Sequence, residues 1–293
     1  MAFAEWAGIA APYDRSFGAL CACTIPDLLA ELRPELGAHT LAPEHAERAS
    51  RNPLLLDVGT GTGSVAIAAA AAGWQVDAFD AEQSMIDFAA RRPDAAGIRF
   101  TTAKLPHLPY PDDAFDAAAA NFAINHVDHP RESLAELRRV LKPGGRFAAT
   151  VWPWGKAPSA TAVLWREIQD ETGAYPPPGN RLPADSDFDR SEAGLSALFA
   201  ECGFVEVRAR RLEFEWAIDA DDLWSGVEAG IALIGYAYRA ADAPTKRRMR
   251  EAYDARTPAF TGADGLLHFP QAAVLAVGVR PGQASDRPQA SDS

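Results

Sequence analysis

Cysteine is scarce in this sequence of 293 residues, which contains only three. Cys21 and Cys23 stand two positions apart, but no second pair completes the spacing of a zinc site. Their simplest interpretation, shared with Cys202, is a set of buried thiols in a reducing compartment. Histidine, aspartate and glutamate form no cluster with metal-ligand spacing either. We therefore expect no metal ion, and we expect a cytoplasmic protein.

Long runs of positive charge are absent, and the formal net charge is −12 with a sequence pI of about 5.0. The densest basic run, 246–250, is flanked by Asp242 and Glu251 and is typical of a solvated helix face. No window approaches the roughly 18 to 20 apolar residues of a membrane span. No charged segment followed by an apolar one opens the chain, so we expect no signal peptide. From these absences we expect that the protein binds neither nucleic acid nor a membrane.

What the sequence does contain is a glycine-rich turn between two apolar segments. Residues 54–58 form a short apolar run that predicts a strand buried on both faces, and residues 64–72 predict an alanine-rich helix. Between them stand Gly59, Gly61 and Gly63 at alternate positions. Glycines let the backbone turn tightly and approach a ligand closely, and the N-terminus of the following helix favours an anionic group. The alternative is a glycine turn that binds nothing.

The spacing of the glycines separates two cofactor classes. A dinucleotide fingerprint requires Gly-x-Gly-x-x-Gly or Ala, whereas here the third glycine, Gly63, comes one residue early. Asp57 precedes the first glycine, and Asp80 ends the next predicted strand, where a carboxylate can accept hydrogen bonds from ribose hydroxyls. This pattern resembles class I S-adenosylmethionine-dependent methyltransferases. The resemblance implies S-adenosyl-L-methionine as cofactor, with the glycine loop under its methionine part and Asp80 at its ribose. The implied contacts here are Asp57, Gly59, Thr60, Gly61, Gly63, Asp80 and Ala81.

A second stretch, 108–116, resembles a Leu-Pro-Phe-x-Asp-x-x-Phe-Asp segment of the small-molecule group that includes the ubiquinone and menaquinone biosynthesis methyltransferases. That group places an acid near the adenine amino group, four residues before the leucine. Here the position is Lys104, which cannot accept a hydrogen bond. We therefore expect the adenine to be held by backbone groups around Ala103 to Leu105, including Lys104; the alternative is that the register of the match is shifted. Met85 is predicted either to cover one face of the adenine or to be core.

Two further segments contribute site residues. Tyr13 lies in a Tyr-Asp-x-x-Phe segment that, in related methyltransferases, lies over the cofactor; the alternative is that it packs the N-terminal arm onto the core. Asn121 ends the fourth predicted strand and Phe122 follows it, at the edge where an open α/β sheet binds ligands. His126 follows them and is our candidate general base for a hydroxyl acceptor, with a structural hydrogen-bonding role as the alternative. His129 and His268 are weaker candidates.

The alternation of elements predicts a doubly wound, mostly parallel seven-stranded sheet, the Rossmann-like methyltransferase fold, with helical insertions over the active site. The expected strands are 54–58, 75–80, 98–102, 115–121, 146–152, 205–217 and 271–279. We expect one domain over 1–280, with an N-terminal helical arm at 1–52, the cofactor-binding core at 53–152, and substrate-covering insertions within 153–270. A disordered tail is expected at 281–293. The connector before the sheet is placed at 42–53.

The predicted function is methyl transfer from S-adenosylmethionine to a small, partly apolar or aromatic metabolite, with an O, N or C acceptor atom. Aromatic residues of the insertions are the candidate walls, or else ordinary core. They are Trp152, Trp154, Trp165, Tyr175, Trp224, Tyr236 and Tyr238. An enzyme of the same fold that catalyses a non-methylating step such as cyclisation is the alternative. An RNA-directed relative and a nicotinamide dehydrogenase are less favoured. We expect a monomer or homodimer.

Overall fold

The computed structural model describes residues 6–33, 52–153, 159–177 and 187–282. Its centre is one seven-stranded sheet with the strand order β3-β2-β1-β4-β5-β7-β6. The first five strands are parallel, and β7 runs antiparallel to both β5 and β6. The strands are β1 Leu54–Val58, β2 Gln75–Asp80, β3 Arg99–Thr102, β4 Phe115–Asn121, β5 Leu141–Val151, β6 Val205–Ile218 and β7 Leu267–Val279. The order reverses between β1 and β4, and ligands of such sheets bind at the carboxyl ends of the strands beside this reversal.

Helices cover both faces of the sheet. One face carries α3 (Ile25–Leu32) and α5 (Ser64–Ala71), whose Leu28 and Val65 join a buried cluster with the alanines of β4. The other face carries α7 (Pro130–Val140) and α9 (Glu192–Glu201), which bury leucines against β1, β4 and β5. β4 reads Phe-Asp-Ala-Ala-Ala-Ala-Asn, and its alanines are fully buried. Small side chains suit this central strand because helices press on it from both sides.

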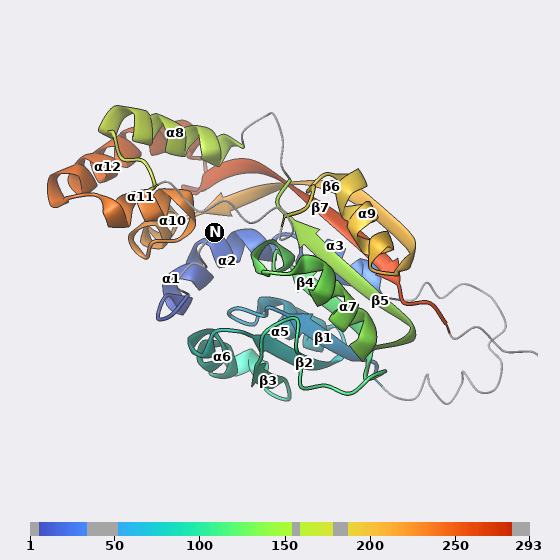
Figure 1. The fold of residues 1–293 in the computed structure, drawn as a ribbon. Helices are drawn as coiled ribbons and strands as arrows, with labels where there is room; N and C mark the ends of the chain where they lie inside the picture. Colours follow the sequence, from blue (N-terminus) through green and yellow to red (C-terminus); the bar gives the residue numbers. More distant parts are fainter. Residues whose placement is uncertain (1–5, 34–51, 154–158, 178–186, 283–293) are drawn as a thin grey trace, which may run out of the picture.

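A separate helical unit lies at the carboxyl end of the parallel strands (Figure 1). It consists of α8 Ala160–Thr172, α10 Ala220–Glu228, α11 Ala232–Ala240 and α12 Ala243–Arg256. Because α10, α11 and α12 connect β6 to β7, the antiparallel edge carries the unit. A third hydrophobic cluster joins these helices to Trp216 and Phe269 of the two strands. The predicted interruption of the sheet edge by helices is thus observed.

The N-terminal arm contributes α1 (Ala10–Arg15), α2 (Phe17–Ala22) and α3. In Figure 1 the first two lie between the helical unit and α6 (Gln83–Ala90). Short 3-10 turns, η1 Pro93–Ala95, η2 Ile124–His126 and η3 Thr257–Phe260, complete the described elements. Most of the predicted connector, 42–51, and most of the predicted tail, 283–293, lie outside the described residues.

Two strands, β5 and β7, begin well before their predicted first residues. β7 begins at Leu267 rather than 271, so it contains Pro270. Its pairing with β5 begins only at Val274, and therefore Pro270 has a strand on one side only, where a missing N–H is tolerated. β5 begins at Leu141 rather than 146, with an irregular register before Arg146 and a positive φ at Gly144. The predicted Lys-Pro-Gly-Gly turn is absorbed into this irregular start.

Candidate cofactor and acceptor site

The glycine loop has a backbone that only glycine adopts easily. Gly59, Gly61 and Gly63 have φ values of 66°, 53° and 90°. A Cβ at Gly59 would lie 2.7 Å from the Cβ of Ala123, and one at Gly63 would lie 3.1 Å from the Cβ of Ala89. Gly63 is also the N-cap of α5 and offers no side-chain hydrogen bond. No N-cap side chain therefore occupies the N–H groups of Ser64 and Val65, the first two of α5.

Asp57 lies beneath this loop rather than in it. It is 1% exposed, and its Oδ2 accepts a hydrogen bond of 2.6 Å from the Thr60 hydroxyl. Burial raises the pKa of Asp57 to about 7, although the Thr60 hydroxyl and the Ala66 N–H favour the ionised form. The Thr60 N–H donates to the carbonyl of Phe79 over 2.9 Å and ties the loop to β2. Asp57 and Thr60 thus fix the path of the loop.

Asp80, at the end of β2, joins the loop from the other side. Its Oδ2 accepts from the Gly61 N–H at 2.9 Å, and its Oδ1 accepts from the Glu82 N–H at 3.0 Å. Burial raises the pKa of its carboxyl group, while these two N–H donors oppose that effect. Each carboxylate oxygen keeps capacity for a second donor, as ribose hydroxyls would require. Ala81 follows on the surface, and Met85 is 2% exposed inside α6.

The arm covers the glycine loop. A carbon of the Tyr13 ring lies 3.6 Å from where a Gly61 Cβ would stand, and the Tyr13 hydroxyl donates to Cys21 Sγ over 3.8 Å. Burial raises the pKa of Tyr13, so this phenol stays neutral. The cavity below the ring has a volume of about 30 Å³, room for about one water molecule. Its lining is Tyr13, Gly18, Cys21, Ala22, Gly59, Thr60, Thr62, Ser64, Val65 and Asn121.

Two contacts hold the arm against α6. Arg92 forms an ion pair of 3.1 Å with Asp14, and the Gly8 N–H donates to the Ser84 hydroxyl over 3.2 Å. The arm therefore lies in a closed position over the loop and Asp80.

Asn121 links the arm to the sheet. Its Oδ1 accepts hydrogen bonds from the hydroxyls of Thr24, at 2.8 Å, and Thr150, at 2.6 Å. Its Nδ2 donates to the carbonyl of Cys21 over 2.8 Å. The next residue, Phe122, has a φ of +53° and stacks on Trp152 with ring centroids 3.9 Å apart. Asn121 borders the cavity, and Phe122 is largely enclosed beside it.

Lys104 occupies the position where the related group has an acid. Its Nζ lies 3.2 Å from Oδ2 of Asp128, in the loop that follows β4. Both side chains are substantially exposed. The pair connects the end of β3 to the loop that carries His126, and Leu105 beside it is 9% exposed. Lys104 therefore places a positive charge at the rim of the predicted adenine region.

His126 belongs to η2 at the carboxyl end of β4. The residue is exposed, but the protein around its imidazole partly desolvates the ring. This desolvation, together with the positive charge of Arg190, lowers the pKa of His126 to about 4. Trp6 packs edge-on against both His126 and Tyr13, at centroid distances of 5.7 and 5.4 Å. A row of rings thus leads from the glycine loop to His126. At neutral pH its imidazole is uncharged and can accept a proton.

The other histidines and most candidate wall residues lie elsewhere. His129 is an exposed N-cap of α7, and His268 is held between Glu215 and Asp264 at 2.8 and 3.0 Å. Trp165 and Trp224 pack on Tyr253, with centroids 5.8 and 5.0 Å away, in the core of the helical unit. Trp154 lies outside the described residues. Among the candidate walls, Trp152 is the one placed beside Phe122.

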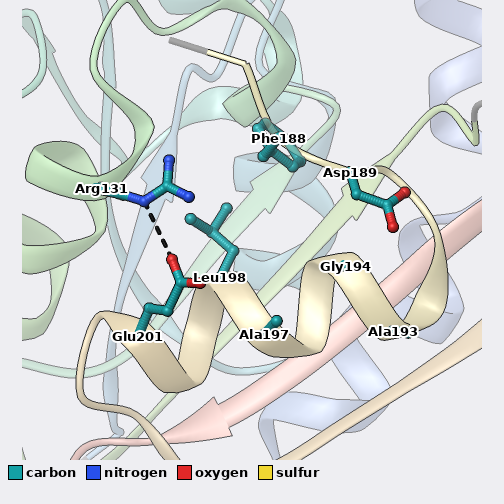
Figure 2. A pocket seen from close by; sticks show the side chains of 8 residues that line it. All are labelled: Arg131, Phe188, Asp189, Ala193, Gly194, Ala197, Leu198 and Glu201. Carbon is teal, nitrogen blue, oxygen red and sulfur yellow. Dashed lines mark hydrogen bonds and ion pairs between the residues drawn. The ribbon is translucent and has the colours of Figure 1, made fainter. Parts of the chain in front are cut away.

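A larger cavity of about 390 Å³ is lined by α9, by Phe188 and Asp189 before it, and by Arg131 of α7 (Figure 2). Phe188, Ala197 and Leu198 give it an apolar floor, and an ion pair of 3.1 Å between Arg131 and Glu201 crosses one end. None of the predicted site residues lines it. It is a surface feature of the α7–α9 face rather than part of the cradle.

Within the described ranges, no group of three or more His, Cys, Asp or Glu side chains is placed to hold a metal ion. No described helix is both long and apolar enough to span a bilayer.

Comparison with known proteins agrees with this geometry. A family model described as a methyltransferase domain matches residues 56–149. A demethylmenaquinone methyltransferase of Thermus thermophilus is 37% identical over 182 residues, which cover 57% of this chain and 80% of the relative. The chain belongs to the class I S-adenosylmethionine-dependent methyltransferases. A demethylmenaquinone methyltransferase of Clavibacter sepedonicus is 41% identical over 110 residues. The match covers 36% of this chain and 42% of that relative, so the chain spans less than half of the relative's length.

The solved structures agree on the fold of this methyltransferase. A putative methyltransferase from an antibiotic biosynthesis pathway of Anabaena variabilis ATCC 29413 superimposes with a TM-score of 0.51 at 18% identity, covering 77% of this chain and 90% of that one. The predicted fold class is therefore confirmed, as is the resemblance to the ubiquinone and menaquinone group. The individual site residues stay predictions.

Several residues of the site were not predicted from the sequence. Gly18, Cys21 and Thr62 line the cavity, and Trp6 and Arg190 lie near His126. No spacing rule connects Trp6 or Arg190 to residue 126, because the contacts arise only when the chain folds. For Gly18 a signal existed: it follows the Tyr-Asp-x-x-Phe segment directly, and a Cβ there would lie 2.8 Å from the Tyr13 carbonyl oxygen.

Proposed function

We propose that this methyltransferase transfers a methyl group from S-adenosylmethionine to a small acceptor bound beside His126. The observation that carries the proposal is the glycine loop, whose Gly61 N–H is fixed by Asp80 while Asp80 keeps free acceptor capacity. The names of the relatives support a small quinone-type acceptor, and demethylmenaquinone is the first one to test. A single domain over 1–280 is part of the proposal.

When bound, S-adenosylmethionine supplies an electrophilic methyl group on its sulfonium. The chain's own residues then have three tasks. Gly59, Gly61 and Asp80 hold the cofactor, Tyr13 closes over it and excludes water, and His126 takes the proton from an acceptor hydroxyl. A pKa of about 4 keeps His126 neutral but makes it a weak base, so it suits an acidic hydroxyl such as that of a phenol or quinol.

Cofactor binding is tested by thermal stabilisation with S-adenosylhomocysteine beside NAD. A hundredfold excess over Kd raises stability by about 2.7 kcal/mol. We expect a shift with S-adenosylhomocysteine alone. Asp80→Asn should lose most of the shift, whereas the exposed Asp87→Asn of α6 should keep it. A shift with NAD alone would overturn the proposed cofactor.

Methyl transfer is tested by mass spectrometry of the acceptor after incubation with S-adenosylmethionine. His126→Gln should slow the reaction about a hundredfold or more if His126 acts as the base, while the Kd for S-adenosylhomocysteine stays within about twofold of the native value. Equal rates in both proteins would remove His126 from the mechanism. Cofactor binding with a transformed but unmethylated substrate would favour a non-methylating step such as cyclisation.

A further inference from the structure

The last strand of the sheet, β6, has a long outer edge. It is 14 residues long, and among the described strands it pairs with β7 alone (Figure 1). The strand at the opposite edge of the sheet, β3, has only four residues. An edge strand carries backbone N–H and C=O groups without a ladder partner, so it can pair with a strand of another chain. β6 is therefore the longer of the two edges at which this sheet can be extended.

The middle of β6 carries charges of both signs on one exposed face. Leu212 and Trp216 are buried in the protein, whereas Arg211, Glu213 and Glu215 are exposed. Successive side chains of a strand alternate between its faces, so these three charged residues share the exposed face. Arg211 and Glu213 form an ion pair of 3.4 Å, with side chains 47% and 80% exposed. A positive and a negative charge thus stand on either side of Leu212.

This order of charges is complementary to itself. In a two-fold symmetric contact, residue i of one copy meets residue j of the other, and j meets i. A two-fold axis level with Leu212 and perpendicular to the sheet sets two β6 strands antiparallel. Arg211 of each copy then lies opposite Glu213 of the other copy. Opposite charges across an antiparallel ladder are stabilising and like charges are destabilising, so this pairing is favoured.

Neighbouring registers lack this complementarity. Opposite side chains must point to the same face of the extended sheet, so the axis lies level with a residue. Moving the axis to Arg211 places that arginine opposite its own copy, and moving it to Glu213 does the same with the glutamate. With the axis at Leu212, the next pair joins Arg210 to Phe214 and adds no like charges. The charges of β6 therefore select one register.

We propose that two copies of this chain associate through β6, antiparallel about Leu212, and so join their sheets into one. Backbone hydrogen bonds of the new ladder supply attraction, and two crossed pairs of Arg211 with Glu213 fix the register. The proposal concerns a surface distinct from the cofactor loop and does not depend on the acceptor. A contact made by a single strand is smaller than an obligate dimer interface, so the association should depend on protein concentration.

Sedimentation velocity of the 293-residue chain at increasing concentration measures the monomer–dimer equilibrium. Arg211→Glu places like charges opposite each other twice and should weaken association about tenfold or more. Combining Arg211→Glu with Glu213→Arg restores opposite charges and should return the dissociation constant to within about threefold of the native value. Arg131→Glu makes the same change of charge at an exposed, ion-paired arginine of α7 and should leave the equilibrium unchanged.

Hydrogen exchange with mass spectrometry tests where the copies meet. Amide exchange in residues 208–216 should slow as protein concentration rises, while exchange in β3 should stay the same. A protein that is monomeric at every concentration would overturn the proposal, as would a dimer that Arg211→Glu does not weaken. A dimer that Arg211→Glu weakens and the double exchange does not recover would overturn the register about Leu212. Protection outside β6 alone would place the contact on another surface and would also overturn the proposal.

Discussion

Asp57 shows how a single buried acid shapes the glycine loop. The position is one residue before the end of β1, so the carboxyl group is enclosed by the sheet, α5 and the loop itself. Only the Thr60 hydroxyl and the Ala66 N–H offset the loss of water. An acid with so few donors keeps its proton to unusually high pH.

This raised pKa gives the first prediction. The folded pKa of about 7 lies above the unfolded value of 3.8, so stabilisation by the protonated form is complete below pH 3.8 and is lost as pH rises toward 7. Asp57→Asn removes the titration. We expect the stability of the variant relative to the native protein to increase between pH 4.5 and 8 by a few kcal/mol, on the order of the linkage energy. Urea unfolding of both proteins at several pH values measures it, and a constant difference would contradict it.

Asn121 and Asn125 are neighbours with opposite hydrogen bonding, which gives a second prediction. Asn125→Leu removes an amide that has no hydrogen-bond partner among the described residues, so stability should stay equal or rise by about 1 to 3 kcal/mol. Asn121→Leu breaks bonds to Thr24, Thr150 and Cys21 and should lower stability by a similar amount or more. Chemical denaturation of the two variants measures the contrast. An equal loss in both would show that Asn125 is a structural residue.

At the scale of elements, the N-terminal arm covers the glycine loop. Helices α1 and α2 are only six residues each, too short to be stable alone. Their position depends on tertiary contacts to α6, α10 and Asn121. The small cavity beneath Tyr13 shows that these contacts hold the arm down.

The third prediction concerns the ion pair between Arg92 and Asp14. Arg92→Ala should loosen the arm and increase both the association and the dissociation rate of S-adenosylhomocysteine, because the arm must open for passage in either direction. Stopped-flow tryptophan fluorescence, with Trp6 near Tyr13 as a reporter, measures both rates. Arg131→Ala, which breaks an exposed pair on the α7–α9 face, is the control. Rates that match in the two variants would argue against the arm as a gate.

At the scale of the whole molecule, three hydrophobic clusters form the buried core of the described residues. Two of them lie on the two faces of the sheet and support the strands that end at the site. The third is the aromatic core of the helical unit, which contains Trp216, Trp224 and Tyr253. The helical unit thus has a core of its own, joined to the sheet through β6 and β7.

This division gives the fourth prediction. S-adenosylhomocysteine should slow amide hydrogen exchange in α1, α2 and the loop at 59–63, where binding orders the arm and uses backbone N–H groups. Exchange in α8, α11 and α12 should change little, since these helices pack on their own core. Hydrogen exchange with mass spectrometry resolves the two regions. Equal protection in both would indicate a rearrangement of the entire molecule.

The sequence by itself determined the fold class and the position of the glycine loop. Both follow from local rules: a buried strand, alternate glycines and an acid at the end of the next strand need only a few consecutive residues to be recognised. The glycine spacing also separated this family from the dinucleotide-binding proteins. The strand boundaries were predicted closely for most of the sheet, but the start of β7 was missed because proline is normally excluded from paired strands.

Only the tertiary structure decided which side chains meet at the site. Trp6 and Tyr13 belong to the N-terminal arm, whereas His126 follows β4, and their rings meet because the arm packs against the carboxyl edge of the sheet. It also assigned Trp165 and Trp224 to a separate core, which composition does not distinguish from a substrate wall. Local patterns record the backbone's preferences, whereas burial, charge and contact between distant segments depend on how the elements pack.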